Sequence, residues 1–161
     1  ASCLVGSEMC IRDRSMIDLK ALVEKHYYNP ITKGSNSLKA VLPAIMHSSP
    51  ILAEKYSKPL PVGINLKDFI LYNQKDGVVK DPYNLLPSLD SILGSDIKDF
   101  IFKKDSLKDG GAAMKAFQVL QYSDISEKEK NSLRKALLNY CELDTLAMVM
   151  LFEHLDYLIS Q

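Results

Sequence analysis

The segment "SEKEKNSLRKALLNYCELDTLAMVMLFEHLDYLI", residues 126–159, decides the fold class of this chain. Ser126 is followed three residues later by Glu129, which is the S-x-x-E capping box that begins helices. From there roughly 30 residues continue without proline or glycine to Ile159, a length of about 45 Å for an unbroken helix. The sequence therefore predicts one long helix at the C-terminal end of a mainly helical chain.

Shorter helices are predicted upstream of this segment. Apolar residues recur between Ile17 and Val23, which suits a short helix or a strand leading into one, and Pro30 ends that element. Residues 38–45 carry an apolar stripe at helical spacing, and Pro43 is expected to end or kink that helix. Residues 112–122 are rich in good helix formers.

The region from 58 to about 105 has a different character and contains four of the seven prolines. Within it, Phe69–Tyr72 are β-prone, Asp76 and Gly77 form a turn signal, and Val78 and Val79 follow, which predicts a hairpin. With fewer than about 50 residues the region has too little core to fold alone. We expect it to be a proline-rich excursion from one domain rather than a second domain.

The composition excludes several classes of protein. The chain has 161 residues, 47% of them hydrophobic, and its 20 basic residues balance 20 acidic ones. This size and composition suit one soluble domain without a global attraction to nucleic acid. No apolar run approaches the roughly 18 residues of a membrane span, and no segment has the order of a signal peptide. A cytoplasmic protein that does not contact the membrane is therefore expected.

The first 14 residues, "ASCLVGSEMCIRDR", show no helical or strand period and no capping signal. They resemble the translated read-through of a sequencing adapter, which predicts a non-native leader; a disordered native N-terminus is the alternative. Without Cys3 and Cys10 only Cys141 remains, so no disulfide framework is expected. The native protein would then begin further upstream, and residues 15–161 would be its C-terminal part.

Tyr140 and Asp144 are the candidate site residues of the long helix. They lie four residues apart in an otherwise apolar run, so they project from the same helix face. A carboxylate can ligate Mg²⁺ or Mn²⁺, and a tyrosine hydroxyl one turn away can orient a water molecule. The same spacing also arises by chance in helices that carry a structural hydrogen-bond network.

Four sequence blocks in a fixed order bear on this choice: "YYNPITKGSNSLKAVLPAI", "DPYNLLPSL", "DGGAAMKAF" and "NYCELDTLAMVMLFEHL". Together they resemble the C-terminal half of the prokaryotic family called domain of unknown function 2779, across residues 15–155. That family is similar to the DEDD (DnaQ-like) 3′–5′ exonucleases, which have a ribonuclease-H-like fold. The resemblance implies that Tyr140 and Asp144 form the third motif, Y-x-x-x-D, in which Asp144 binds metal and Tyr140 orients water.

The chain departs from the full DEDD pattern, because the D-x-E of the first motif occurs nowhere in it. The resemblance therefore implies the helical C-terminal half of an α/β ribonuclease-H-like domain, with a small β-hairpin and with the central sheet largely missing. Apolar surface should be exposed where that sheet is missing. Asp18 stands where such exonucleases often carry an acid, but a capping or hydrogen-bonding role is preferred for it.

Several other residues were weighed as site candidates. The turn 33–37 could bind a phosphate at a helix N-terminus with Lys33 or Lys39 beside it, or it could simply cap the helix; Asp109 could cap the helix that follows it. Glu142 is expected to be exposed because it turns well away from Asp144. Cys141 is expected to be a buried structural thiol. Met148 and Met150 are expected in the core.

Two functions follow from these observations. The first is the C-terminal fragment of a metal-dependent 3′–5′ exonuclease of DNA or RNA, which is inactive by itself and needs Mg²⁺ or Mn²⁺ and the missing N-terminal half of its domain. One carboxylate cannot hold two divalent ions, which is why the fragment should be inactive. The second is a non-catalytic helical binding or scaffold module, in which Tyr140 and Asp144 serve only a hydrogen-bond network.

Overall fold

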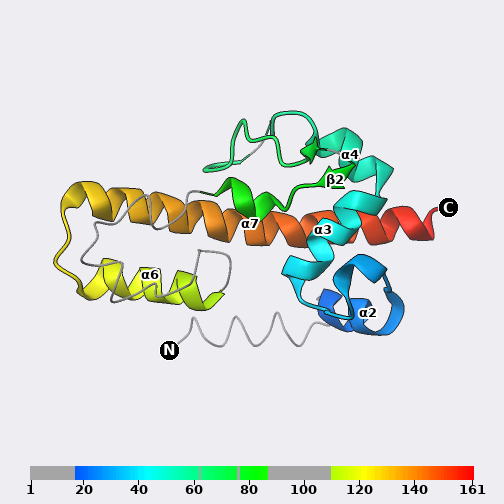
Figure 1. The fold of residues 1–161 in the computed structure, drawn as a ribbon, viewed down its shortest axis with the longest axis horizontal. Coiled ribbons are helices and arrows are strands. Elements are labelled where there is room, and N and C mark those ends of the chain that lie inside the picture. Colours follow the sequence, from blue (N-terminus) through cyan, green and yellow to red (C-terminus); the bar gives the residue numbers. More distant parts are fainter. Residues whose placement is uncertain (1–16, 62, 76, 87–109) are drawn as a thin grey trace, which may run out of the picture.

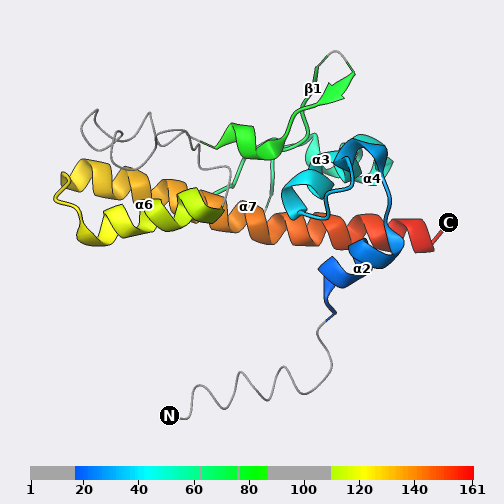
Figure 2. The same cartoon turned by 60° about the horizontal axis from the view of Figure 1, so that its bottom comes forward.

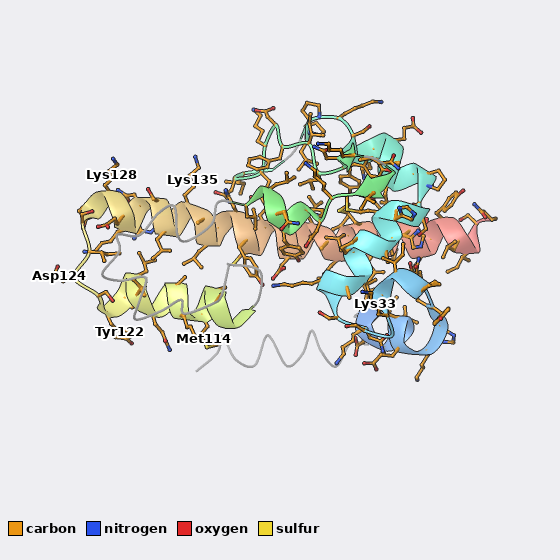
Figure 3. The ribbon with its side chains drawn as sticks, in the orientation of Figure 1. Lys33, Met114, Tyr122, Asp124, Lys128 and Lys135 are labelled. Atoms are coloured by element: carbon orange, nitrogen blue, oxygen red, sulfur yellow. The ribbon has the colours of Figure 1, made fainter. Side chains whose placement is uncertain are left out.

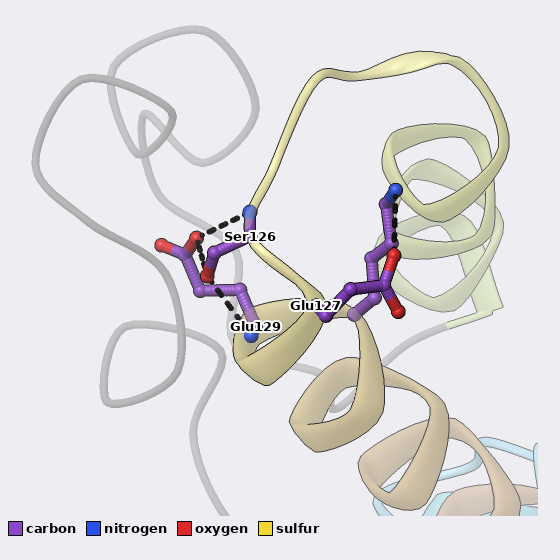
Figure 4. Close-up of polar contacts among 4 residues, drawn as sticks. Ser126, Glu127 and Glu129 are labelled. Atoms are coloured by element: carbon purple, nitrogen blue, oxygen red, sulfur yellow. Dashed lines mark hydrogen bonds and ion pairs between the residues drawn. The ribbon is translucent and has the colours of Figure 1, made fainter.

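The computed structural model describes residues 17–61, 63–75, 77–86 and 110–161, and one long helix runs through this part of the chain (Figure 1). Helix α7, Glu127–Ile159, has 33 residues, which confirms the predicted helix. Its capping box is formed: Ser126 Oγ accepts from the Glu129 amide at 3.3 Å, and the Glu129 carboxylate accepts from the Ser126 amide at 2.9 Å (Figure 4). Two of the orphan N–H groups at the helix start are therefore satisfied.

Three helices pack along the C-terminal part of α7: α2 (Leu19–His26), α3 (Leu38–Ser48) and α4 (Pro50–Tyr56). Figures 1 and 2 show them grouped at the C-terminal end of the long helix. Pro43 lies inside α3 and does not end it. An interior proline removes its own N–H bond and its ring clashes with the carbonyl four residues earlier. Burial of the apolar residues after it, Ile45 and Met46, in the larger core offsets that cost.

The proline-rich segment contributes to that same core as far as the structure describes it. Its short elements are the strands β1 (Gln74–Lys75) and β2 (Val78–Val79), and the 3-10 helix η2 (Pro82–Leu85). A second 3-10 helix, η1 (Pro30–Thr32), lies upstream between α2 and α3. Buried side chains from this segment join α3, α4 and α7 in one cluster: Leu60, Leu66, Leu71, Val79, Tyr83 and Leu86. The described residues of the segment 58–86 therefore have no separate core of their own.

The predicted hairpin is confirmed, but its first strand was misplaced. The antiparallel pair joins Gln74 to Val79 and Lys75 to Val78, so the strand begins after Tyr72. The β-prone Phe69–Tyr72 stretch instead docks on neighbouring loops and helices, because the Tyr72 amide donates to the Tyr56 carbonyl at 2.8 Å. A tertiary hydrogen bond has overridden the local β preference.

Helix α6, Gly110–Tyr122, lies beside the N-terminal half of α7 in both views (Figures 1 and 2). It starts two residues before the predicted position. The two helices share a second, smaller apolar cluster made of Ala112, Ala116, Val119, Ile125, Leu133 and Ala136. The described part of the chain thus has two cores, and α7 contributes to both.

The structure confirms a mainly helical protein with one small antiparallel sheet in its described part. The ribonuclease-H-like origin stays a prediction. Several expectations fall outside the described residues: the non-native leader 1–14, the Asp76 turn position, the capping role of Asp109, and the excursion beyond residue 86. Some apolar side chains of α7 are exposed, and Phe152, for example, is 53% exposed. That a missing sheet would cover them stays a prediction.

Candidate functional site

Tyr140 and Asp144 lie one turn apart on α7, as their spacing predicts. The Tyr140 side chain is buried, with 6% of its surface exposed, and Asp144 is half-buried. Both residues stand where α7 faces α3 and η2 rather than on an open surface stripe. The pair therefore belongs to a packed polar cluster.

Tyr83, from η2, joins this cluster and was missed by the sequence reasoning. Its hydroxyl donates a hydrogen bond to the Asp144 carboxylate. Its amide donates to Asp81 Oδ1 at 3.0 Å, so the capping residue of η2 fixes the backbone from which Tyr83 projects. Burial of the Tyr83 phenol, reinforced by the hydrogen bond to Asp144, raises its pKa above the ordinary value. Tyr83 is therefore a protonated donor that orients the Asp144 carboxylate.

Lys39 completes the cluster from the first turn of α3. Its Nζ lies 5.1 Å from the Tyr83 ring centroid and 4.9 Å from that of Tyr140. The two rings are tilted by 50°, with centroids 6.0 Å apart, so one ammonium group contacts the faces of both. Cation–π contacts of this kind stabilise a lysine position where water is partly excluded. Four residues from three elements thus form the Asp144 cluster: Lys39, Tyr83, Tyr140 and Asp144.

The turn before α3 was considered both as a phosphate site and as a plain turn with a helix cap, and the choice between the two stays a prediction. Lys33 adopts a left-handed conformation (φ 52°), is exposed and ends the 3-10 helix η1, and Gly34 follows with φ 79°. Ser37 occupies the N-cap position of α3 but makes no side-chain capping bond. Figure 3 shows Lys33 at this turn. The lysine that reaches the candidate site is Lys39, through the two tyrosine rings.

The prediction that Glu142 is freely exposed was wrong. Its carboxylate accepts hydrogen bonds from the Ile64 amide at 3.0 Å, the Asn65 amide at 2.7 Å and the Asn65 side-chain amide at 2.8 Å. Burial raises the pKa of Glu142, but the hydrogen bonds from Asn65 and Ile64 outweigh that effect, and the pKa lies below its ordinary value. Glu142 does point away from Asp144, but it points toward the loop at residues 64–65. The sequence of α7 alone could not predict that this loop lies there.

Gly63 makes this close approach possible. Its φ is +147°, and a Cβ atom added there would stand 2.7 Å from Glu142 Oε1. Glycine is the residue that tolerates both the backbone conformation and the approach of a carboxylate. The loop 63–65 and Glu142 therefore form a fitted contact, which we call the Glu142 cradle.

Two other expectations about α7 need correction. Cys141 is exposed rather than buried, because the core face of α7 is taken by its neighbours Tyr140 and Leu143. Met150 is buried in the core as expected, but Met148 is 40% exposed. Residues two positions apart differ by about 200° on a helix, so both could not face one core.

Asp18 has the capping role that the sequence favoured. Its Oδ1 accepts from the amides of Lys20 at 3.0 Å and Ala21 at 3.3 Å, at the start of α2. The side chain is exposed and serves the helix end. Asp18 is therefore explained without a catalytic function.

His154 is a buried titratable group at the far end of α7. It is 3% exposed, its ring meets that of Tyr27 edge-on at 5.7 Å, and its Nδ1 is buried without a hydrogen-bond partner in the described structure. Burial lowers its pKa below the ordinary value. Burial thus favours the neutral imidazole of His154, which packs as an aromatic ring.

Comparison with known proteins found no matching family model, no matching curated protein and no matching solved structure. Among the described residues, no helix combines the length and the apolar character that crossing a membrane requires.

Proposed function

We propose that this chain is the C-terminal part of a metal-dependent 3′–5′ exonuclease-like domain acting on DNA or RNA. The observation that carries the proposal is the Asp144 cluster. A half-buried carboxylate, oriented by the Tyr83 hydroxyl and lying one turn from Tyr140, has the character of a metal ligand prepared by an outer hydrogen bond. Sequence blocks quoted for the family resemblance supply all four residues of this cluster.

The donor set of the described residues does not by itself fit a divalent-metal site. Mg²⁺ and Mn²⁺ prefer several oxygen ligands, and the described part of the chain holds no group of three or more residues that could bind a metal together. Asp144 would supply one carboxylate. Under this proposal the missing N-terminal half of the domain supplies the remaining acids, and this chain alone is expected to be inactive.

The C-terminal part of α7 offers a surface for that missing half. Apolar side chains lie exposed beyond the Asp144 cluster: Met148, Val149, Phe152, Leu158 and Ile159. Single exposed apolar residues are ordinary, but several on one helix mark a surface that another element covers. Packing there would bring further acids close to Asp144.

A non-catalytic scaffold module is the second candidate. One observation favours it: Asp144 already accepts a hydrogen bond that ties η2 to α7. In that case Tyr83, Tyr140 and Asp144 would only fasten the proline-rich segment to the long helix. The two candidates differ in what the loss of the Asp144 charge does.

The test is Asp144→Asn in the complete protein, with Asp156→Asn as the matched control. Asp156 is an exposed acid on the same helix, so it undergoes the same chemical change away from the cluster. Asp144→Asn should reduce Mn²⁺-dependent degradation of single-stranded DNA or RNA by more than about 100-fold, because loss of even an outer-shell partner reaches that range. If Asp144→Asn degrades nucleic acid as fast as the Asp156→Asn control, the exonuclease proposal is wrong and the scaffold function is favoured.

A further inference from the structure

A groove of about 530 Å³ lies between α6 and the N-terminal half of α7. Lys130 and Arg134 come from α7, and Phe117 from α6 is 53% exposed. None of the described side chains that line the groove is acidic; the lining includes Phe117, Gln121, Lys130, Arg134, Leu137 and Cys141. The groove thus combines two cations with an accessible aromatic ring and an apolar floor.

The groove is collinear with the Asp144 cluster. Four of its five α7 residues, Lys130, Arg134, Leu137 and Cys141, follow one another at spacings of four, three and four, and Asp144 comes three residues later. Such spacing places these four and Asp144 on one ridge of a helix. Arg134 and Asp144 are ten residues apart, or about 15 Å along α7. The lining ends at Cys141, so a ligand in the groove would have to extend one further helical turn along this face to approach Asp144.

The charge of α7 is divided along its length. Residues 127–135 hold four basic and two acidic residues, whereas residues 136–159 hold four acidic residues and no lysine or arginine. Figure 3 shows Lys128 and Lys135 projecting from the side of α7 that faces away from α6, so they do not line the groove. Lys130 pairs with Glu127 at 3.2 Å (Figure 4), while Arg134 is exposed. Two cations, Lys130 and Arg134, thus line the groove although the whole chain is neutral.

We infer that this groove binds a single strand of nucleic acid and leads its end toward Asp144. Lys130 and Arg134 contact phosphates, and Phe117 stacks on a base, which is the combination that single-strand binding surfaces use. Its direction toward Asp144 rests on the proposed exonuclease function. The binding itself requires only the α6–α7 pair.

The first test measures binding by the 161-residue chain. A fluorescein-labelled oligothymidylate of about ten nucleotides matches known site sizes, and its anisotropy is followed at several salt concentrations. The double variant Lys130→Gln/Arg134→Gln should weaken binding about tenfold and reduce the salt slope by about 1.4, that is, 0.7 for each lost phosphate contact. Phe117→Ala should weaken binding at least about fivefold.

The matched control is Lys75→Gln/Lys80→Gln, which removes the same charge from exposed lysines of the β1–β2 hairpin. This control should keep its affinity within about twofold, since the hairpin lies away from the groove (Figure 2). Equal losses in both double variants would overturn the inference, as would an intact chain that does not bind the oligonucleotide. Binding of an acidic amphipathic peptide in its place would also overturn it.

The second test uses the exposed thiol of Cys141 in the groove. In a Cys3→Ser/Cys10→Ser background, saturating oligothymidylate should slow alkylation of Cys141 by iodoacetamide at least about tenfold, and an unchanged rate would contradict the placement. Degradation that persists in Asp144→Asn would overturn the exonuclease proposal, whereas absent binding or unprotected Cys141 would overturn the groove proposal. The two failures are therefore distinguishable.

Discussion

The Glu142 cradle makes a quantitative prediction, because one glycine and one carboxylate meet there at close range. Gly63→Ala places a methyl group 2.7 Å from Glu142 Oε1 at a backbone position with φ +147°. Glu142→Ala removes the acceptor of three hydrogen bonds from Ile64 and Asn65. Both changes abolish the same contact, so their effects on the free energy of unfolding must be coupled.

The magnitudes follow from the geometry. The positive φ costs a non-glycine residue about 1–3 kcal/mol, and displacement of the carboxylate adds about 1 kcal/mol, so Gly63→Ala should cost about 2–4 kcal/mol. Glu142→Ala should cost about 1–2 kcal/mol, because its hydrogen bonds are charged but partly exposed to water. The double variant should cost about 1 kcal/mol less than the sum.

Urea unfolding followed by circular dichroism measures all three values. Gly34→Ala is the control, since Gly34 has φ +79° but nothing within 4 Å of an added Cβ, and its cost should add to that of Glu142→Ala. A coupling below about 0.5 kcal/mol between Gly63 and Glu142 would refute the cradle. Because the folded pKa of Glu142 is lowered, its contribution is present above about pH 4.5 and should fade below it.

Two further predictions concern buried side chains. Tyr83→Phe removes the hydroxyl that orients Asp144 and should lower the free energy of unfolding by about 1–2 kcal/mol in urea titrations, whereas Tyr28→Phe, at an 83% exposed ring, should have almost no effect. Equal effects of the two changes would argue against a buried hydrogen bond. Burial lowers the pKa of His154, so the unfolded chain binds a proton more readily, and stability should fall as the pH drops below about 6.5. His154→Phe should flatten this pH dependence and exposed His26→Phe should not; a slope unchanged by His154→Phe would mean that another group titrates.

Local signals in the sequence were sufficient where an element begins or continues by its own chemistry. The Ser126–Glu129 capping box and the run free of proline and glycine predicted α7, and Asp18 was recognised as a cap. In each case the interacting groups lie within a few residues of one another. Such contacts form whatever the rest of the chain does.

The sequence predicted only some of the contacts between residues that are distant along the chain. Tyr140 and Asp144 were paired by their helical spacing, but Tyr83 is 61 residues from Asp144 in the sequence, and no period links them. Glu142 was correctly turned away from Asp144, yet its partners come from a loop 77 and 78 residues upstream. Helical geometry gives the direction of a side chain but not the element that will lie there.

The buried apolar side chains of α7 belong to two separate clusters, and this affects which parts of the protein unfold locally. The larger cluster takes α7 residues from Tyr140 onward, whereas the smaller cluster takes Leu133 and Ala136. Apart from Ala113, which also touches the larger cluster, α6 packs on the smaller one, so we expect α6 and the first three turns of α7 to open together as a cooperative unit of lower stability. Amide protons before Leu138 should then exchange with solvent by local opening, while those beyond it wait for global unfolding. A ligand bound in the α6–α7 groove would slow exchange only of the amides before Leu138, because it binds only when α6 and the start of α7 are folded.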